Sequence, residues 1–423
     1  MFALWFCFGI TALYLASVII RKKDIFNPIT LVISLNFFTL GIAHTAIDPH
    51  WNGLQPITWA VILISSLTLF VGGQLVEVYT QSGRHDTQMN LSHLSSTLNN
   101  YSWTRHFRIG LALFFIMLLG FSYIYVKSGG IPIFHPEKNL MTRSGSIDFG
   151  FFAPFVLRGP EVFLVFLLAT YKKINPHLLM RRWAIVMAII TLILSLCFFQ
   201  SRMNVLTCIV FITYLHHNFK RQLGLRHFVI ILAFFSSIFV FIAILRNQME
   251  MGEHLFKTTE ALKLPYQYIA NNWWNLDYGL NPEPGQTVAP FKYGWGFIEG
   301  ISFFFPDAMA MGVAFNWDTI FNESVVKVTG LNTVTWHWSV YNEFGYFGII
   351  VFPLFFGIFI QYFYQYLKQK PTLIKVGIYS YLSIFLMLSW FEEFYQNALY
   401  IYWVLTIVIT IKLAQANQLT RPK

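Results

Sequence analysis

The chain has 423 residues, of which 56% are hydrophobic, 19% are aromatic and only 11% are charged, yet its formal net charge is +10. A soluble globular domain has about a quarter of its residues charged, and disordered chains lack this much apolar mass. The composition therefore excludes a large water-soluble enzyme and a disordered chain. The three cysteines, Cys7, Cys197 and Cys208, lie inside apolar runs, so the sequence offers neither a disulfide framework nor a Cys-x-x-Cys metal site.

Long apolar runs recur along the whole chain. A helix needs about 20 apolar residues to cross the hydrocarbon core of a bilayer, and roughly eleven runs meet or approach this length. In chain order they are approximately Phe2–Ile20, Ile29–Ile47, Ile57–Val78, Ile109–Val126, Phe149–Tyr171, Trp183–Phe199, Val205–Asn218, Phe228–Leu245, Val340–Leu367, Leu373–Trp390 and Tyr395–Leu413. The pattern predicts an all-α polytopic integral membrane protein with about 11 transmembrane helices.

The basic residues indicate the orientation of these helices. In the first run the positive cluster Arg21, Lys22 and Lys23 follows the apolar stretch, which is not the order of a cleavable signal peptide and favours an N-terminus outside. If the chain then crosses the membrane alternately, the inner loops carry 19 of the 29 Lys and Arg residues but only three of the 19 acidic residues. Cytoplasmic loops collect Lys and Arg. The net charge therefore predicts a cytoplasmic C-terminus and requires no nucleic acid partner.

The same threading leaves one long extramembrane segment, the outer loop Asn247–Trp336. Within it, the apolar stretch Phe297–Phe315 is expected to be interfacial or re-entrant, because a further crossing would reverse the charge asymmetry. The expected organisation is transmembrane helices 1–8 in residues 1–246, a large outer loop in residues 247–336 and transmembrane helices 9–11 in residues 337–423. The polar stretch Tyr79–Tyr101 is expected to be a solvated inner connector.

Four arginines fall on the outer side, where basic residues are normally scarce: Arg143, Arg158, Arg202 and Arg246. Arg158 lies about nine residues into the fifth run, roughly 12 Å deep, and Glu161 follows it at i+3. Individually, an Arg near lipid is explained by snorkelling, and an Arg158–Glu161 pair by locking of helices. Together the four favour an anion site, because guanidinium groups bind phosphate oxygens in a bidentate manner.

The outer loop also carries aromatic residues interleaved with amides and carboxylates. The candidates for substrate binding are Trp273, Trp274, Asn275 and Trp295. Such a set is typical either of an aromatic belt at the lipid headgroups or of a sugar-binding surface, on which flat rings stack and amides fix hydroxyl groups.

The segment that leads into the ninth run contains His337, Tyr341 and Glu343. His337 and Tyr341 share a helical face if the helix begins early enough. His337 is either an interfacial histidine or a general acid or base. Three glycines are expected to thin this helix for close packing against a neighbour: Gly345, Gly348 and Gly357. The sequence contains no metal-ligand constellation and no nucleotide-binding or hydrolase motif, so we expect neither a metal nor a cofactor.

The stretch NTVTWHWSVYNEFGYFGIIVFPLFFGIFIQYFY resembles the signature of the bacterial oligosaccharide repeat-unit polymerases, the Wzy-type O-antigen and capsule polymerases. In these proteins a Thr-containing approach leads into a Tyr-x-[Asp/Glu]-Phe-Gly-x-x-Gly helix. The similarity extends to Gly129–Pro132 followed by Arg143, to the Ser-Arg turn at Arg202 and to the Arg-Asn at Arg246. Glu343 stands where the family more often has Asp.

The resemblance implies a metal-independent, GT-C-like glycosyltransferase in the bacterial inner membrane. It would transfer a growing glycan from undecaprenyl pyrophosphate to the next lipid-linked repeat unit on the outer face, making lipopolysaccharide O-antigen, capsule or exopolysaccharide. The partners it implies are the lipid-linked oligosaccharide and membrane lipids, and it leaves open whether a chain-length regulator binds.

In this interpretation the four arginines would stabilise the leaving pyrophosphate, Arg158 and Arg246 acting as catalytic residues and Arg143 and Arg202 as substrate-binding ones. His337 or Glu343 would be the base, and Glu161 and Tyr341 would join the four loop residues in binding substrate. Alternatives are a flippase of the same lipid-linked sugar, an O-antigen ligase and a membrane acyltransferase.

Overall fold

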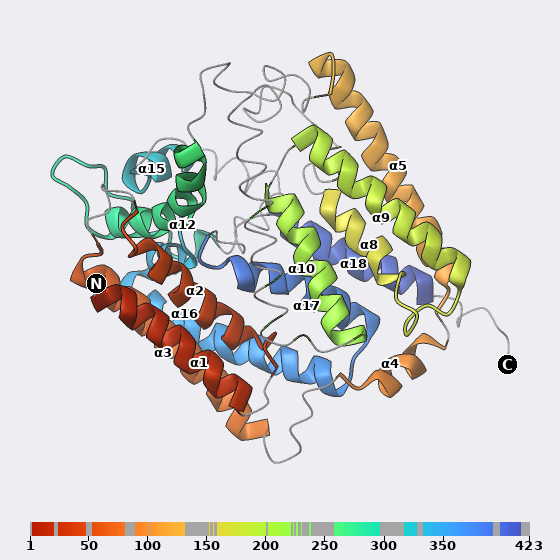
Figure 1. Ribbon diagram of the computed structural model, residues 1–423, viewed down its shortest axis with the longest axis horizontal. Coiled ribbons are helices and arrows are strands. Elements are labelled where there is room, and N and C mark those ends of the chain that lie inside the picture. The colour runs from red at the N-terminus through yellow and green to blue at the C-terminus, as the bar shows by residue number, and fades with distance from the viewer. Residues whose placement is uncertain are drawn as a thin grey trace. The chain divides into compact units, whose positions relative to one another are not determined.

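The structure, a computed structural model, describes most of the chain as helix (Figure 1). The described residues are 2–20, 24–47, 53–80, 89–99, 101–131, 152, 155, 159–199, 202–220, 223, 226, 230, 237, 258–296, 317–327, 333–391 and 398–415, and the side chains at 159–160, 199, 202–204, 258–264, 317–319 and 398–401 are excepted. All regular elements in these ranges are helices, as the apolar runs predict. The chain divides into two compact units, and each is described by itself.

Unit 1 comprises Met1–Thr87, Leu262–Lys368 and Phe385–Ile401. Its helices are α1 (Phe2–Ile20), α2 (Pro28–Ala43), α3 (Pro56–Thr80), most of α12 (Thr258–Leu280), α15 (Trp317–Ser324) and α16 (Trp336–Gln369). The helix α2 begins where its sequence favours it, because the Asn27 side chain accepts hydrogen bonds from the N–H groups of Ile29 and Thr30 and Pro28 occupies the first turn. This helix is buried along nearly its whole length.

The helices α3 and α16 cross at backbone contact. A Cβ atom added to Gly72 would lie 2.2 Å from the carbonyl oxygen of Leu354, and one added to Gly357 would lie 2.4 Å from that of Leu69. Small residues allow such close approach between membrane helices. The prediction that Gly357 thins its helix for packing is therefore confirmed, and Gly72 is its counterpart on α3.

A buried ion pair fixes the turn between α1 and α2 to the end of α16. The Lys368 ammonium lies 2.6 Å from Oδ2 of Asp24, and their side chains are only 7% and 4% exposed. Asp24 also accepts hydrogen bonds from the Tyr364 hydroxyl and from the backbone N–H of Phe26. Removing one partner of a buried pair leaves an uncompensated charge, at a cost of about 3–5 kcal/mol, so this turn and the helix end are held together strongly.

Unit 2 comprises Gln88–Ala261, Gln369–Ile384 and Tyr402–Lys423. Its helices are α4 (Leu91–Leu98), α5 (Trp103–Ser128), α8 (Gly159–Leu168), α9 (Leu178–Phe199), α10 (Arg202–Phe219) and parts of α17 (Leu373–Leu388) and α18 (Ala398–Gln415). The helix α8 packs against α5, α9 and α10. Its described side chains are all buried and, except for Glu161, apolar, as expected for a helix that neighbours surround. The stretch Tyr79–Tyr101, which is expected to be a solvated inner connector, contains the short helix α4, whose first turn Asn90 caps.

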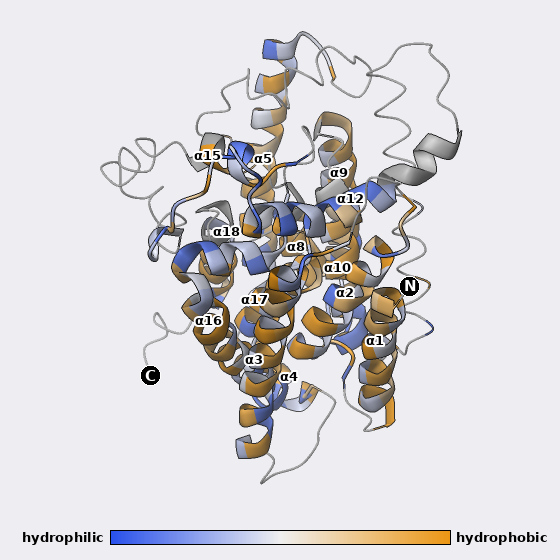
Figure 2. Cartoon of the chain, turned by 90° about the vertical axis from the view of Figure 1, so that its left-hand side faces the viewer, coloured by the Kyte–Doolittle hydropathy of each residue, from blue (hydrophilic) through white to orange (hydrophobic). Residues whose placement is uncertain are grey.

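Among the residues that the structure describes, five helices are long and apolar enough to cross a membrane: α1, α3, α5, α9 and α16. Figure 2 shows hydrophobic residues along them, and many of these side chains are exposed, such as Leu67 on α3 and Phe355 and Phe359 on α16. Apolar faces of this extent require a lipid environment, so the protein is embedded in a membrane. The eighth apolar run, apart from the two single residues Ile230 and Ser237, and the stretch Phe297–Phe315 lie outside the described residues.

We predict that Gly72→Ala and Gly357→Ala each destabilise the protein by about 1–3 kcal/mol, because the added methyl group overpacks a backbone contact. Thermal unfolding of the detergent-solubilised protein measures the effect. Gly9→Ala on α1 is the matched control, since its new Cβ would meet no atom within 4 Å. Equal melting temperatures for all three variants would contradict close contact between α3 and α16.

Candidate functional site

The twelve residues predicted from the sequence divide between the two units. Five fall within the bounds of unit 2: Arg143, Arg158, Glu161, Arg202 and Arg246. Arg143, Arg158 and Arg246 lie outside the described residues, and Arg202 begins α10 with its side chain not described. Glu161 lies in the first turn of α8, where it is buried and its Oε1 accepts a hydrogen bond of 3.2 Å from the Tyr381 hydroxyl. The other seven belong to unit 1.

The helix α16 begins at Trp336, early enough for the predicted pair His337 and Tyr341 to share one helix. The imidazole of His337 is fully buried, and its Nδ1 lies 3.1 Å from the Thr335 hydroxyl. Its ring centroid lies 4.6 Å from that of Trp336 and 5.6 Å from that of Trp273 on α12. The sequence prediction thus places His337 and Trp273 in one site, and the structure brings their rings into contact.

Tyr341 has different surroundings from His337. Its ring contacts Phe291, Trp338 and Tyr346, and its side chain is only half-buried. The two residues share the first turns of the helix but not the same neighbours.

The helix α16 is broken immediately after Glu343. Phe344 has φ −140° and ψ 21°, and Gly345 has φ 59° and ψ −139°, a conformation that only glycine adopts easily. A Cβ atom on Gly348 would lie 2.3 Å from the carbonyl oxygen of Val340, because the break folds one segment closely onto the other. Gly345 and Gly348 therefore serve the break, which corrects the expectation that they thin the helix for a neighbour.

The residues 291–295, hereafter the strap, fill the hydrogen-bonding positions that the break opens. The N–H of Lys292 donates to the carbonyl of Asn342 at 2.8 Å, and the N–H of Tyr293 donates to the carbonyl of Glu343 at 2.9 Å. The next N–H, of Gly294, donates to the Glu343 carboxylate at 2.7 Å. Three consecutive amides thus bind the end of the first segment of α16.

Glu343 has a structural task that the sequence did not reveal. Its side chain is buried, and one carboxylate oxygen accepts the hydrogen bond from the N–H of Gly294 in the strap. Six residues separate it from His337, so at 3.6 residues per turn the two side chains point about 120° apart around the helix axis. They are therefore not interchangeable candidates for one position. Trp295 follows the strap contacts directly and its N–H donates to the Lys292 carbonyl at 2.9 Å.

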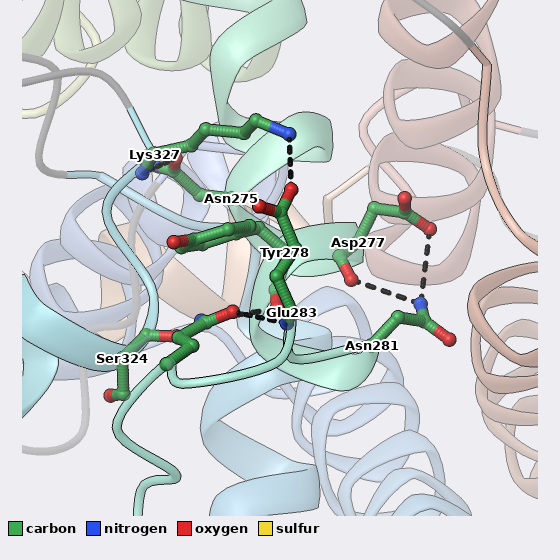
Figure 3. Close-up of polar contacts among 8 residues, drawn as sticks. Asn275, Asp277, Tyr278, Asn281, Glu283, Ser324 and Lys327 are labelled. Atoms are coloured by element: carbon green, nitrogen blue, oxygen red, sulfur yellow. Dashed lines mark hydrogen bonds and ion pairs between the residues drawn. The ribbon is translucent and has the colours of Figure 1, made fainter.

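The side chains of α12 show two kinds of environment (Figure 3). Asn275 is buried and bridges two backbone groups, accepting from the N–H of Lys327 at 3.1 Å and donating to the carbonyl of Thr333 at 2.8 Å. Trp274 and Tyr278 each have the Lys327 ammonium 5.2 Å from their ring centroids, and this ammonium also pairs with Glu283 at 3.1 Å. Asn275 thus holds the backbone at Lys327 and Thr333 against α12, whereas Trp274 is half-buried and its ring faces the Lys327 ammonium.

Asp277 connects α12 to the beginning of α3. Its Oδ1 accepts hydrogen bonds from the N–H of Gln55 at 2.8 Å and from the Thr58 hydroxyl, and Asn281 donates to the same carboxylate (Figure 3). A carboxylate is favourable at a helix N-terminus. No local signal in the sequence connects Asp277 with a partner more than 200 positions away.

No protein-family model, no curated protein and no solved structure matches this chain. Functional inference therefore depends on the residues and their geometry. Within the ranges given for the structure, no three His, Cys, Asp or Glu side chains come together as metal ligands.

We predict that Gly345→Ala and Gly348→Ala weaken the contact between the strap and α16. The added Cβ is strained by the positive φ at position 345 and clashes with the Val340 carbonyl at position 348, at a cost of about 1–3 kcal/mol. Hydrogen exchange should become faster at the amides of Lys292 and Tyr293. Gly285→Ala is the control, since it also has positive φ but meets no atom within 4 Å. Unchanged protection of both amides in the α16 variants would contradict the break.

Proposed function

We propose that the protein is an oligosaccharide repeat-unit polymerase of the bacterial inner membrane. The observation that carries the proposal is the first segment of α16, a membrane helix that begins with the buried His337, ends at the carboxylate of Glu343 and breaks there. Ionisable residues inside membrane segments are costly and mark functional sites. The neighbouring α12 supplies aromatic and amide side chains, the chemistry that sugars require.

In the proposed reaction a hydroxyl group of the acceptor sugar attacks the anomeric carbon of the donor glycan. His337 takes the hydroxyl proton, the new C–O bond forms, and the bond to pyrophosphate breaks with its electron pair leaving on the phosphate oxygen. The leaving group needs fixed positive charge, for which Arg143, Arg158, Arg202 and Arg246 are the candidates. The proposed topology and orientation come from the sequence. The chain has about 11 membrane spans in a GT-C-like fold, its N-terminus lies outside and its C-terminus in the cytoplasm. The reaction takes place on the outer face.

The geometry around Glu343 favours His337 as the base. Glu343 already accepts the N–H of Gly294, so its carboxylate has a positioning role at the break. In Glu343→Gln the side-chain carbonyl oxygen can still accept this hydrogen bond, but the side chain can no longer act as a base. This substitution therefore distinguishes a positioning role of Glu343 from a role as general base.

We predict that His337→Gln lowers the polymerisation rate by 100-fold or more, the usual contribution of a general base being about 10²–10⁴. Glu343→Gln should retain most of the rate, whereas Glu343→Ala should lose it together with the strap contact. The measurement is the initial rate of chain growth on lipid-linked repeat units. An active His337→Gln together with an inactive Glu343→Gln would assign the base to Glu343.

A flippase for the lipid-linked oligosaccharide is the second candidate, and the break in α16 is the observation that favours it. Discontinuous helices form the binding sites of many transporters. An O-antigen ligase would share the chemistry of the polymerase. Product analysis separates all three, because loss of a polymerase leaves one repeat unit on the final acceptor, loss of a flippase leaves none, and loss of a ligase leaves long chains on the carrier lipid.

We predict that Arg158→Ala and Arg246→Ala abolish long polymer while single repeat units still reach the final acceptor, because the leaving pyrophosphate loses its positive partners. Gel analysis of the surface glycan in a complemented deletion strain measures this, with membrane abundance of each variant determined in parallel. Arg182→Ala, an exposed position on α9, is the control. Normal polymer from both variants would contradict the assignment of pyrophosphate to these arginines.

A further inference from the structure

A group of five uncharged polar side chains is buried in unit 1. Asn36 belongs to α2, Asn272 and Trp273 belong to α12, and Trp336 and His337 open α16. All five are at most 7% exposed, and three of them, Asn272, Trp273 and His337, are fully buried. We refer to them as the polar cluster.

Contacts between rings and hydrogen bonds to Ser389 connect four members of the polar cluster. The His337 ring contacts the rings of both Trp273 and Trp336. The N–H of Trp336 donates to the carbonyl of Ser389 at 3.0 Å, and the Asn36 amide donates to the hydroxyl of the same serine at 2.8 Å. Asn272 precedes Trp273 on α12. Three helices therefore contribute to one polar region.

Five atoms of the polar cluster have no hydrogen-bond partner among the residues that the structure describes. They are the indole nitrogens of Trp273 and Trp336, Nε2 of His337, and the side-chain carbonyl oxygens of Asn36 and Asn272. Buried polar groups are almost always paired, because an unpaired group loses its hydration without compensation. Four of these atoms belong to side chains that are connected directly or through Ser389, and Asn272 adjoins Trp273 along α12. So many unpaired buried atoms in one region indicate a site that a ligand completes.

The donor and acceptor pattern defines the chemistry of that ligand. The two indole N–H groups donate, the two amide carbonyls accept, and His337 Nε2 does either according to its tautomer. None of the five groups is formally charged, whereas a multiply charged anion such as pyrophosphate is bound most strongly by cationic donors, and the five groups combine donors with acceptors. A hydroxyl group both donates and accepts, and aromatic rings pack against the apolar face of a pyranose.

We propose that the polar cluster is the subsite for the acceptor sugar, and that it binds the hydroxyl groups of a neutral pyranose. This inference rests on the proposed function, in which His337 Nε2 receives the proton of the reacting hydroxyl. The site is distinct from any pyrophosphate site, because its groups carry no charge. Since its atoms are covered in the present conformation, the sugar enters as the indole rings separate.

The test compares two probes on the full-length protein in nanodiscs by titration calorimetry. One probe is the lipid-free oligosaccharide of a single repeat unit, and the other is undecaprenyl pyrophosphate without sugar. Trp273→Phe and Trp336→Phe keep an aromatic ring but remove one N–H each. Trp59→Phe is the matched control, because Trp59 lies in the same unit and stacks on His44, outside the cluster.

Each of the two cluster variants should weaken oligosaccharide binding about 5–10-fold, the effect of one lost hydrogen bond, and leave the affinity for the sugar-free lipid unchanged. The control should change neither. If the oligosaccharide binds equally to all variants, or if only the sugar-free lipid binds more weakly, the sugar subsite is wrong.

A second measurement uses the wild-type protein alone. The oligosaccharide should slow modification of His337 by diethyl pyrocarbonate, read by mass spectrometry, and the sugar-free lipid should not. No slowing by the oligosaccharide would overturn the subsite, including the case in which water alone completes the cluster.

The subsite and the proposed function fail in different ways. Chain growth by the wild-type protein together with unchanged oligosaccharide affinity in the variants would leave a polymerase with its acceptor elsewhere. Weaker oligosaccharide binding by the variants without any chain growth would leave a sugar-binding membrane protein that is not a polymerase.

Discussion

The break in α16 leaves backbone carbonyl groups without their usual hydrogen-bond donors, and another part of the chain must supply these donors. In an apolar environment every backbone carbonyl needs a hydrogen-bond donor. A continuous helix would supply the carbonyls of Asn342 and Glu343 from its own next turn, but the conformation at Phe344 and Gly345 interrupts this pattern. The strap supplies the missing donors from a distant part of the chain. The position of residues 291–295 is therefore a consequence of the break.

The break also gives α16 two segments with different tasks. The second segment crosses α3 at Gly72 and Gly357, where contact between backbones leaves no space for larger side chains. The first segment is short and carries His337, whose ring lies against the indole of Trp273 on α12. Asp277 holds α12 to the beginning of α3. The closely packed pair of α3 and the second segment of α16 thus adjoins the short segment that carries the proposed base, and a proposed site gains from such support.

The sequence predicts the positions of the apolar helices, because these depend on the local hydrophobic pattern. The first apolar run coincides with α1, and the ninth, expected at Val340–Leu367, corresponds to α16 from Trp336 to Gln369. Hydrophobic length decides both, because lipid imposes it directly. The sequence predicts Trp273 as a substrate-binding residue of the outer loop and His337 as a catalytic residue at the start of the ninth run, but it does not predict that their rings are in contact.

Contacts between distant residues are what the sequence could not supply. The strap reaches Glu343 across 49 positions, and the glycines beside it looked like packing residues because their spacing alone cannot reveal a positive φ. The hydrogen bond that Asp277 accepts from the N–H of Gln55 spans 222 positions and has no local sequence signal either. The short helix α4 has little apolar pattern and was missed. Three of the four predicted arginines lie outside the described residues, and the fourth is described only in its backbone.

The central claim is that this membrane protein joins sugar units, with His337 as the base at the head of a broken helix. The most direct measurement is incubation of the purified protein, reconstituted in vesicles, with a lipid-linked repeat unit, followed by separation of the products by length. The account predicts a ladder of lipid-linked chains that grow by one repeat unit at a time, with free undecaprenyl pyrophosphate released in equal amount to the bonds formed. A repeat unit that crosses the vesicle bilayer without any change in length would contradict the account and indicate a transporter.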